Sequence, residues 1–141
     1  MGVMTTTNTY LHFNGNCAEA MQFYKKVLGG KLNILKQKDT PMGKDSPYGK
    51  PDDVMHASLE FGGGTIMASD WITNEKYPGM NAFEICLMVP TVQEAKKLFD
   101  ALSKDGKIKM PLNKTAWVEA FAMFVDRFGT PWMINGGKSL M

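Results

Sequence analysis

Four side chains in the 141-residue sequence stand out by their chemistry: its two histidines, His12 and His56, and its two cysteines, Cys17 and Cys86. Imidazole can bind a divalent metal or transfer a proton near neutral pH. The two cysteines lie far apart and do not form the pattern of a disulfide framework. We expect two reduced, buried thiols, as in the reducing cytoplasm. Cys17 falls near a predicted helix start, where a thiol pKa tends to fall, so a reactive Cys17 is the alternative.

A second candidate site is apolar and aromatic. Trp117, Glu119 and Phe121 alternate along one predicted strand and therefore share a face. Met133 lies on the next predicted strand and joins that face if its neighbour Trp132 packs toward a helix. Such a wall, with one carboxylate, suits an organic ligand of modest size. The same residues could also be plain core, and the sequence leaves both interpretations open.

Length and charge limit the other possibilities. A chain of 141 residues suits one compact domain, so we predict a single domain over residues 1–141. A net charge of +2 with scattered lysines gives no basis for nucleic-acid binding. No apolar run approaches the roughly 18 residues of a membrane span, and residues 1–10 lack the pattern of a signal peptide. We expect a cytoplasmic protein that binds neither nucleic acid nor membranes.

The first half of the chain combines one helix with β-branched and aromatic strands. Asn16 is the predicted N-cap of the helix, with Glu19 placed to reach back, and Gly29-Gly30 ends it. Residues 38–53 are a predicted loop because they hold three prolines and two glycines. The predicted strands cover residues 9–13, 31–37, 54–61 and 65–69.

The second half repeats this order. Thr91 and Glu94 form the predicted capping box of a second helix, which Asp105-Gly106 ends. The predicted strands cover residues 82–89, 107–110, 117–125 and 131–135. The two halves also match position by position, pairing Asn16 with Thr91, Ala20 with Ala95, Tyr24 with Phe99, and Gly30-Lys31 with Gly106-Lys107.

The sequence therefore predicts an α+β fold of two βαβββ modules in tandem, at about residues 8–70 and 81–137. One face of each sheet packs on the helix, and the other face stays open. We expect the two sheets to curl around a shared cleft. The long connections at residues 38–53 and 70–80 could close this cleft as lids.

Three segments carry a family resemblance: YLHFNGNCAEAMQFYKKVLGG, VMHASLEFGGGTIMASD and WVEAFAMFVDRFGTPWMIN. In this order and spacing they resemble the vicinal-oxygen-chelate superfamily, which includes glyoxalase I, bleomycin-resistance proteins and extradiol dioxygenases, and within it the PhnB-like branch. Some members of this branch are labelled 3-demethylubiquinone methyltransferases. The sequence has no glycine-rich strand-to-helix turn that would hold a methyl-donor nucleotide, so we do not expect methyl transfer.

The resemblance implies a homodimer of paired modules. It also implies one divalent metal (Zn, Ni, Mn or Fe) in the cleft, with up to four protein ligands, one on the first and one on a later strand of each module. Such a metal acts as a Lewis acid on two vicinal oxygens of a substrate. Aligned on the anchors of this sequence, the four ligand positions fall on Thr9, His56, Glu84 and Met133.

Only two of these positions suit such a metal. His56 and Glu84 are competent ligands, whereas Thr9 is poor and Met133 is too soft. A one-residue shift in the first strand would turn His12 or Tyr10 into the cleft in place of Thr9. His12, His56 and Glu84 would then form a two-histidine-one-carboxylate set. Alternatively, His12 lies partly buried against the helix, and the other two are ordinary polar groups of the cleft.

Two functions remain open. The first is a binding protein that sequesters or senses a small organic ligand in an apolar and aromatic cleft, with a degraded metal site. The second is a divalent-metal-dependent lyase, isomerase or dioxygenase, whose catalytic residues are not identified. The soft Met133 and the aromatic strand favour the first. The expected cleft residues are His56, Ser58, Glu84, Trp117, Glu119, Phe121 and Met133.

Overall fold

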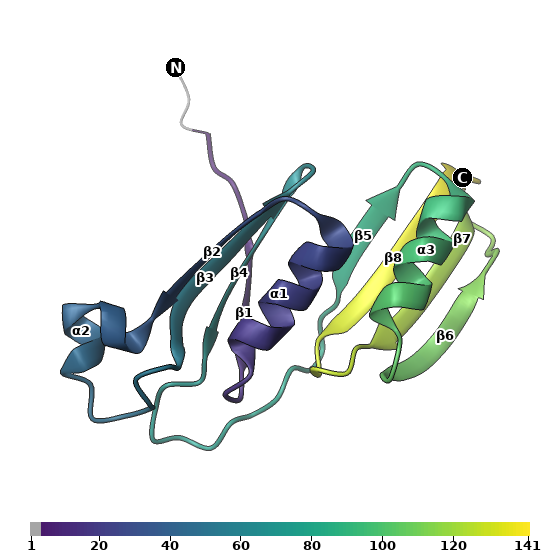
Figure 1. Ribbon diagram of the computed structural model, residues 1–141. Helices are drawn as coiled ribbons and strands as arrows, with labels where there is room; N and C mark the ends of the chain where they lie inside the picture. The colour runs from purple at the N-terminus through teal and green to yellow at the C-terminus, as the bar shows by residue number, and fades with distance from the viewer. Residues whose placement is uncertain (1–3) are drawn as a thin grey trace. The chain divides into compact units, whose positions relative to one another are not determined.

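The computed structural model describes residues 4–141. Residues 1–3, part of the N-terminal segment in which no signal peptide is expected, lie outside the described residues. The chain forms two compact units that divide between Pro78 and Gly79. Each unit is a four-stranded sheet with one long helix against it (Figure 1). Within residues 4–141, none of the helices is long and apolar enough to cross a membrane.

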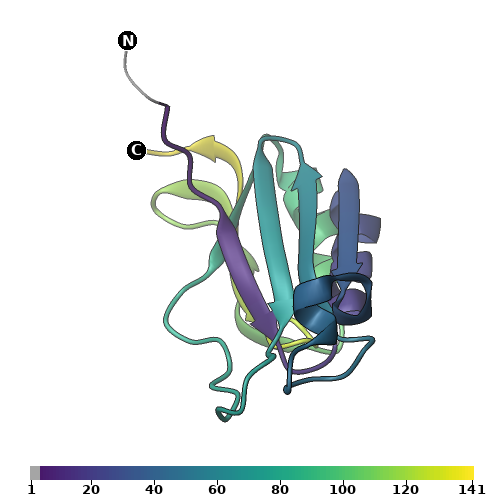
Figure 2. The same cartoon turned by 90° about the vertical axis from the view of Figure 1, so that its left-hand side faces the viewer.

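The first unit ends at Pro78, and its elements are β1 (Thr9–Phe13), α1 (Cys17–Leu28), β2 (Lys31–Lys36), η1 (Gln37–Asp39), α2 (Pro41–Lys44), β3 (Val54–Phe61) and β4 (Gly64–Asp70). The strand order is β1-β4-β3-β2. β1 pairs with β4 in parallel, and the other pairs are antiparallel. Figure 2 looks onto this sheet, with β1 at one edge and β2 at the other.

The second unit starts at Gly79, and its elements are β5 (Ile85–Val89), α3 (Val92–Leu102), β6 (Lys107–Asn113), β7 (Val118–Val125) and β8 (Pro131–Ser139). The strand order β5-β8-β7-β6 repeats that of the first unit. Gly30 and Gly106, which the sequence repeat pairs, also have equivalent surroundings. A Cβ on Gly30 would overlap the carbonyl oxygen of Glu60, and one on Gly106 that of Val125. The two predicted βαβββ modules are confirmed.

Matched aromatic pairs hold each helix over its sheet. In the first unit, Tyr24 of α1 packs beside Phe13 of β1, with ring centroids 6.4 Å apart. In the second unit, Phe99 of α3 meets Phe124 of β7 edge-on at 5.6 Å. Tyr24, Phe13 and Phe124 are almost fully buried. Because large aromatic side chains bury much apolar surface, these pairs contribute strongly to the two cores.

The two long helices begin differently. In α3 the side chain of Thr91 accepts a hydrogen bond from the Glu94 amide at 3.1 Å, as predicted. In α1, Asn16 occupies the predicted N-cap position, but its side chain makes no capping bond. The carboxylate of Asp70, at the end of β4, instead accepts a bond from the Cys17 amide at 2.9 Å. A long-range contact thus replaces the local cap.

Several predicted strand ends are wrong. The strand that was expected to stop before Pro111 continues to Asn113. It lies at the sheet edge, where a proline need not interrupt the ladder. The strand expected from residue 82 begins at Ile85, because Ala82 has a left-handed φ of 65°. The last strand runs beyond residue 135, to Ser139.

The predicted loop at residues 38–53 contains one unexpected helical turn. Pro41 starts α2, where proline is tolerated because its missing N–H would be unpaired in any case. The hydroxyl of Thr40 caps the turn by accepting a bond from the Gly43 amide at 2.8 Å. The loop composition therefore concealed a proline-initiated helical turn.

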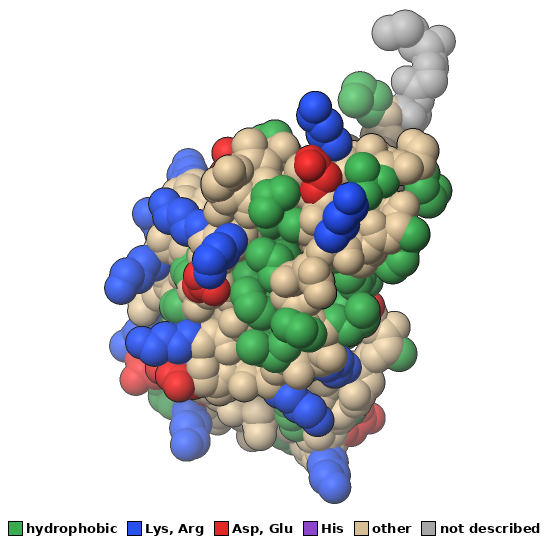
Figure 3. Space-filling model, turned by 90° about the vertical axis from the view of Figure 1, so that its right-hand side faces the viewer, with side chains coloured by type: hydrophobic (Ala, Val, Ile, Leu, Met, Phe, Trp, Pro, Cys, Tyr) green, Lys and Arg blue, Asp and Glu red, His purple; other side chains and the backbone are tan. Residues whose placement is uncertain are grey.

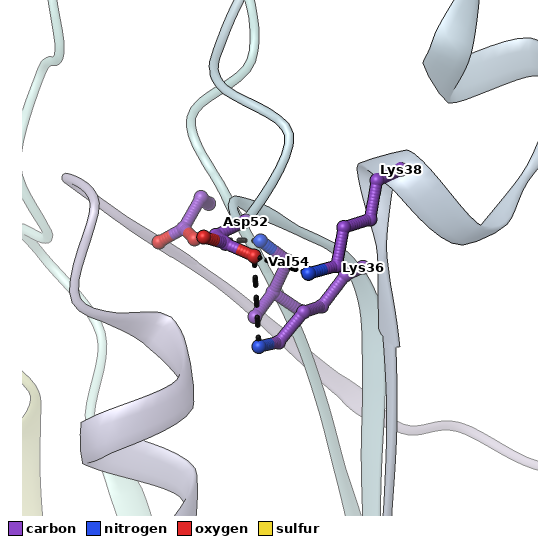
Figure 4. Close-up of polar contacts among 5 residues, drawn as sticks. Lys36, Lys38, Asp52 and Val54 are labelled. Atoms are coloured by element: carbon purple, nitrogen blue, oxygen red, sulfur yellow. Dashed lines mark hydrogen bonds and ion pairs between the residues drawn. The ribbon is translucent and has the colours of Figure 1, made fainter.

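A surface ion pair joins the two ends of this connection (Figure 4). Lys38 Nζ lies 2.8 Å from Asp52 Oδ1, and Lys36 Nζ lies 3.8 Å from the same oxygen. The hydrogen bond to Lys38 lowers the pKa of Asp52, and the same contact raises the pKa of Lys38. Because all three side chains are exposed to water, the pairing adds little to stability.

Candidate functional site

The open face of the first sheet, the face turned away from α1, carries both histidines. Along β1, Leu11 and Phe13 are buried on the α1 side, so Tyr10 and His12 point to the other side. Thr9 lies two residues before Leu11, so its side chain projects to the same face as those of Leu11 and Phe13, toward α1. The sequence left two orientations of this strand open, and the structure has the one that places His12 on the open face.

Tyr10 lies beside both histidines. Its hydroxyl is 3.2 Å from His56 Nδ1. Its ring centroid is 5.1 Å from that of His12 and 5.7 Å from that of His56. His12 Nδ1 is in turn 3.1 Å from the hydroxyl of Ser69. Each imidazole therefore uses Nδ1 in a contact with a hydroxyl group.

The connection after β4 packs onto one end of this face. The Trp71 ring meets His12 edge-on at 5.2 Å, and the Tyr77 hydroxyl donates a 2.6 Å hydrogen bond to the main-chain oxygen of His12. Burial raises the pKa of Tyr77 and lowers the pKa of His12, which favours neutral imidazole. His12, Trp71 and Met55 help to line a small hollow of about 300 Å³.

β3 contributes the remaining polar side chains of this face. Ala57 and Leu59 are buried on the α1 side, so His56, Ser58 and Glu60 point to the open side. Ser58 is half-buried, whereas His56 and Glu60 are exposed.

The three candidate metal ligands come from separate segments of the chain. His12 and His56 lie on β1 and β3, which are separated by β4. Glu84 belongs to the second unit, where it is exposed in the segment before β5 rather than on a strand as expected. Within residues 4–141, no group of three His, Cys, Asp or Glu side chains could hold a metal ion. Catalytic metals in proteins normally have about three such ligands.

The open face of the second sheet is apolar. Trp132 is buried on the α3 side of β8, so Met133 and Asn135 point to the opposite side, as expected for Met133. Trp117 and Phe121 lie near each other, with ring centroids 5.3 Å apart in an edge-to-face arrangement. Phe121 is only 5% exposed, whereas Trp117 is 42% exposed.

These side chains line a groove of about 670 Å³ that lies within the second unit. Sequence reasoning identified Trp117, Phe121 and Met133 but missed Met88 and Asn135. Alternation could have revealed both, because each neighbours a buried residue on its strand. The lining includes Met88, Val89, Pro90, Trp117, Val118, Phe121, Met133 and Asn135.

Glu119, which was expected in the wall of the cleft, is not among the residues that line this groove. The register between β7 and β8 shifts between Val118 and Ala120, which leaves a bulge opposite Glu119. Its Oε1 accepts a 2.6 Å hydrogen bond from the Lys138 amide in this bulge. The carboxylate therefore satisfies a backbone group.

The two cysteines are both free, but their surroundings differ. Cys17 is fully buried, and this burial, with a smaller contribution from Asp70, raises its pKa. The expected lowering at a helix start does not occur, because removal of the thiolate from water outweighs it. Cys86 was expected to be buried but is exposed on the open face of the second sheet. There its Sγ accepts a hydrogen bond from Asn135 Nδ2 at 3.1 Å.

The second unit also exposes several large apolar side chains. Figure 3, which faces the side where this unit is drawn, shows an area of hydrophobic side chains bordered by lysine or arginine and acidic side chains. Such an area is typical of a binding surface rather than of scattered exposure. The most exposed large apolar side chains of the second unit, wherever they lie on its surface, are Met88, Ile108, Met110, Trp117, Leu140 and Met141.

Comparison with known proteins places the chain in a family. Residues 5–135 match the family described as 3-demethylubiquinone-9 3-methyltransferase. Protein YjdN of Escherichia coli (strain K12) is 34% identical over 135 residues, which cover 89% of this chain and 91% of the relative.

Solved structures extend this likeness. Protein PA1353 from Pseudomonas aeruginosa is 41% identical, with a TM-score of 0.88 and coverage of 95% of this chain and 98% of that one. A putative 3-demethylubiquinone-9 3-methyltransferase, PhnB protein, from Bacillus cereus is 26% identical, with a TM-score of 0.77 and coverage of 94% and 100%.

A more distant structure shares the fold alone. A glyoxylase/bleomycin resistance protein/dioxygenase domain from Frankia sp. EAN1pec is 14% identical, with a TM-score of 0.62 and coverage of 97% and 100%. The chain therefore belongs to the family described as 3-demethylubiquinone-9 3-methyltransferase, in agreement with the PhnB-like resemblance of its sequence.

Proposed function

We propose that this PhnB-like protein binds a small organic molecule in the apolar groove of its second unit. The observation that carries this proposal is the groove itself, about 670 Å³ and walled by Trp117, Phe121 and Met133. Its volume lies within the ~300–1,000 Å³ range of ligand pockets, which are mostly apolar with a few polar groups.

The wall also indicates the ligand class. The exposed Trp117 ring, braced edge-on by the buried Phe121, offers a flat apolar surface on which an aromatic or unsaturated ring can stack. The Asn135 amide supplies the polar contact, because its oxygen can accept a hydrogen bond while its nitrogen holds Cys86. We infer a ligand with a flat apolar body and one hydrogen-bond donor.

The proposal does not include methyl transfer or metal chemistry. The turns that lead from a strand into the long helices α1 and α3 are Asn14–Asn16 and Pro90-Thr91, and neither is glycine-rich. The donor residues described above do not fit a metal with three protein ligands. His56, Ser58 and Glu84, which the sequence predicted for the cleft, do not line this groove and are not part of the proposed site. A homodimer, as the resemblance implies, and a cytoplasmic location, as the cysteine usage suggests, are part of the same proposal.

The test is the binding of 1-anilinonaphthalene-8-sulfonate, followed by fluorescence, to the full chain and two variants. Trp117→Ala should raise the dissociation constant about tenfold, because loss of an aromatic contact costs roughly 0.5–1.5 kcal/mol beyond its buried area. Tyr48→Ala is the matched control, since Tyr48 is a similarly exposed aromatic residue of the first unit. Equal affinity in the wild type and Trp117→Ala, or equal loss in both variants, would refute the groove as the site.

A further inference from the structure

The four strands of the second sheet each place one sulfur-containing side chain in a single row. Cys86 of β5 is the register partner of Met133 of β8. Met133 is the partner of Met123 of β7, and Met123 is the partner of Met110 of β6. We call Cys86, Met133, Met123 and Met110 the sulfur row.

All four side chains point to the open face. Residues that are partners across a sheet project to the same side, and Trp132, next to Met133, is buried on the α3 side. Cys86 and Met110 are exposed, and Met123 and Met133 are half-buried. The row is therefore reachable from solvent at its ends and more enclosed in its middle.

The spacing of the row suits a shared metal ion. Side chains directly opposite each other on neighbouring strands have Cβ atoms about 4.5–5.5 Å apart. Two sulfurs that share a metal with bonds of about 2.3 Å lie no more than about 4.6 Å apart. The flexible Met133 side chain can bring its thioether to that distance from Cys86 without backbone movement.

The donor chemistry selects the ion. Thiolate and thioether ligands are soft and favour Cu(I), whereas the hard ions Mg²⁺ and Mn²⁺ prefer oxygen. Asn135 Nδ2 donates a hydrogen bond to Cys86 Sγ at 3.1 Å and so fixes the position of that sulfur beside β8. Binding replaces the thiol proton of Cys86 by Cu(I), and the proton is released to solvent without any change of oxidation state.

We infer that the Cys86 end of the sulfur row is a site for one Cu(I) ion, with the Cys86 thiolate and the Met133 thioether as its two protein ligands. The site goes beyond the proposed organic-ligand function and does not depend on it, although both use Met133. The divalent-metal positions considered from the sequence, His12, His56 and Glu84, take no part.

The test is an anaerobic titration of the reduced, metal-free full chain with Cu(I) in competition with bicinchoninate. We expect one Cu(I) per chain, with the affinity lowered at least about tenfold in both Cys86→Ser and Met133→Leu. Leucine keeps the apolar volume of methionine and removes only the sulfur, so the fold should persist. Met42→Leu, which alters an exposed methionine of the first unit, should bind as the wild type does.

A second measurement uses Ag(I) as a redox-inert probe. Iodoacetamide should alkylate Cys86 in the metal-free protein, because the other thiol, Cys17, is buried with a raised pKa. One equivalent of Ag(I) should block this reaction in the wild type but much less in Met133→Leu. The site would be overturned if Cys86→Ser or Met133→Leu bound Cu(I) as tightly as the wild type. It would also be overturned if Ag(I) protected Cys86 from alkylation equally well in Met133→Leu and in the wild type.

Discussion

The carboxylate of Asp70 accepts a hydrogen bond from the main-chain amide of Cys17 at 2.9 Å and thereby begins helix α1 from the end of strand β4. Its other oxygen accepts a bond from the Val54 amide at 2.8 Å, at the start of β3. Asp70 is only 4% exposed. One side chain thus ties together three elements of the first unit.

Replacement of this carboxylate should be costly. Asp70→Ala would leave two buried amides without acceptors, and each such loss costs about 1–3 kcal/mol. We expect the free energy of unfolding to fall by roughly 2–4 kcal/mol, measured by urea denaturation followed by circular dichroism. Asp52→Asn, which alters an exposed carboxylate paired with Lys38, should leave the urea midpoint almost unchanged. Similar midpoints for the two variants would contradict the bridging role.

Gly136 should resist even the smallest side chain. A Cβ at this position would overlap the Cβ of Ala95 on α3, which is fully buried and cannot move aside. Overpacking of this kind costs about 1–3 kcal/mol, so Gly136→Ala should lower the melting temperature by several degrees in calorimetry. Gly63→Ala is the control, because a Cβ at Gly63 would meet no atom within 4 Å and the φ of this residue is not left-handed. A normal melting temperature for Gly136→Ala would show that α3 shifts freely on β8.

His12 should make stability fall in mild acid. Burial lowers its pKa in the folded state below the ordinary value of 6.5, so the unfolded chain takes up a proton first as pH falls. The stabilisation from neutral His12 is therefore complete above about pH 6.5 and is lost as pH falls from there through the folded-state pKa. The urea midpoint should drop less between pH 7.5 and 5.5 in His12→Gln than in the wild type. An equal drop in both proteins would assign the pH dependence to other groups.

Divalent metals should not be retained through the histidines. The purified, untagged protein can be equilibrated with equimolar Zn(II), Ni(II), Mn(II) and Fe(II), and its metal content measured by plasma mass spectrometry. Because the described residues offer no group of three suitable donors, we expect much less than one ion per chain, with no change in His56→Ala. About one ion per chain, lost in His56→Ala, would favour the metal-dependent enzyme instead and justify assays with hemithioacetals and catechols.

The sequence by itself determined the architecture of both units. Two local patterns indicate which side of an element is buried: the alternation of apolar residues along a strand, as in Thr9–Phe13, and the apolar stripe along a helix, as in Ala20 and Tyr24 of α1. The match of Gly30 with Gly106 showed the repeat, because each position allows close approach of two backbones. Such patterns depend on local geometry, which a single segment carries within itself.

Only the tertiary structure decided how the candidate sites are built. The Asp70 carboxylate caps α1 by accepting a hydrogen bond from the Cys17 amide, and the Glu119 carboxylate accepts one from the Lys138 amide in the bulge of β8. Each of these two hydrogen bonds joins segments that are distant in the sequence and that no local pattern connects. The row from Cys86 to Met110 likewise depends on the register of four strands, which is set by strand pairing across the whole sheet. Side-chain types and the face that each strand buries can be inferred from sequence, but partners distant in the chain follow only from the packed fold.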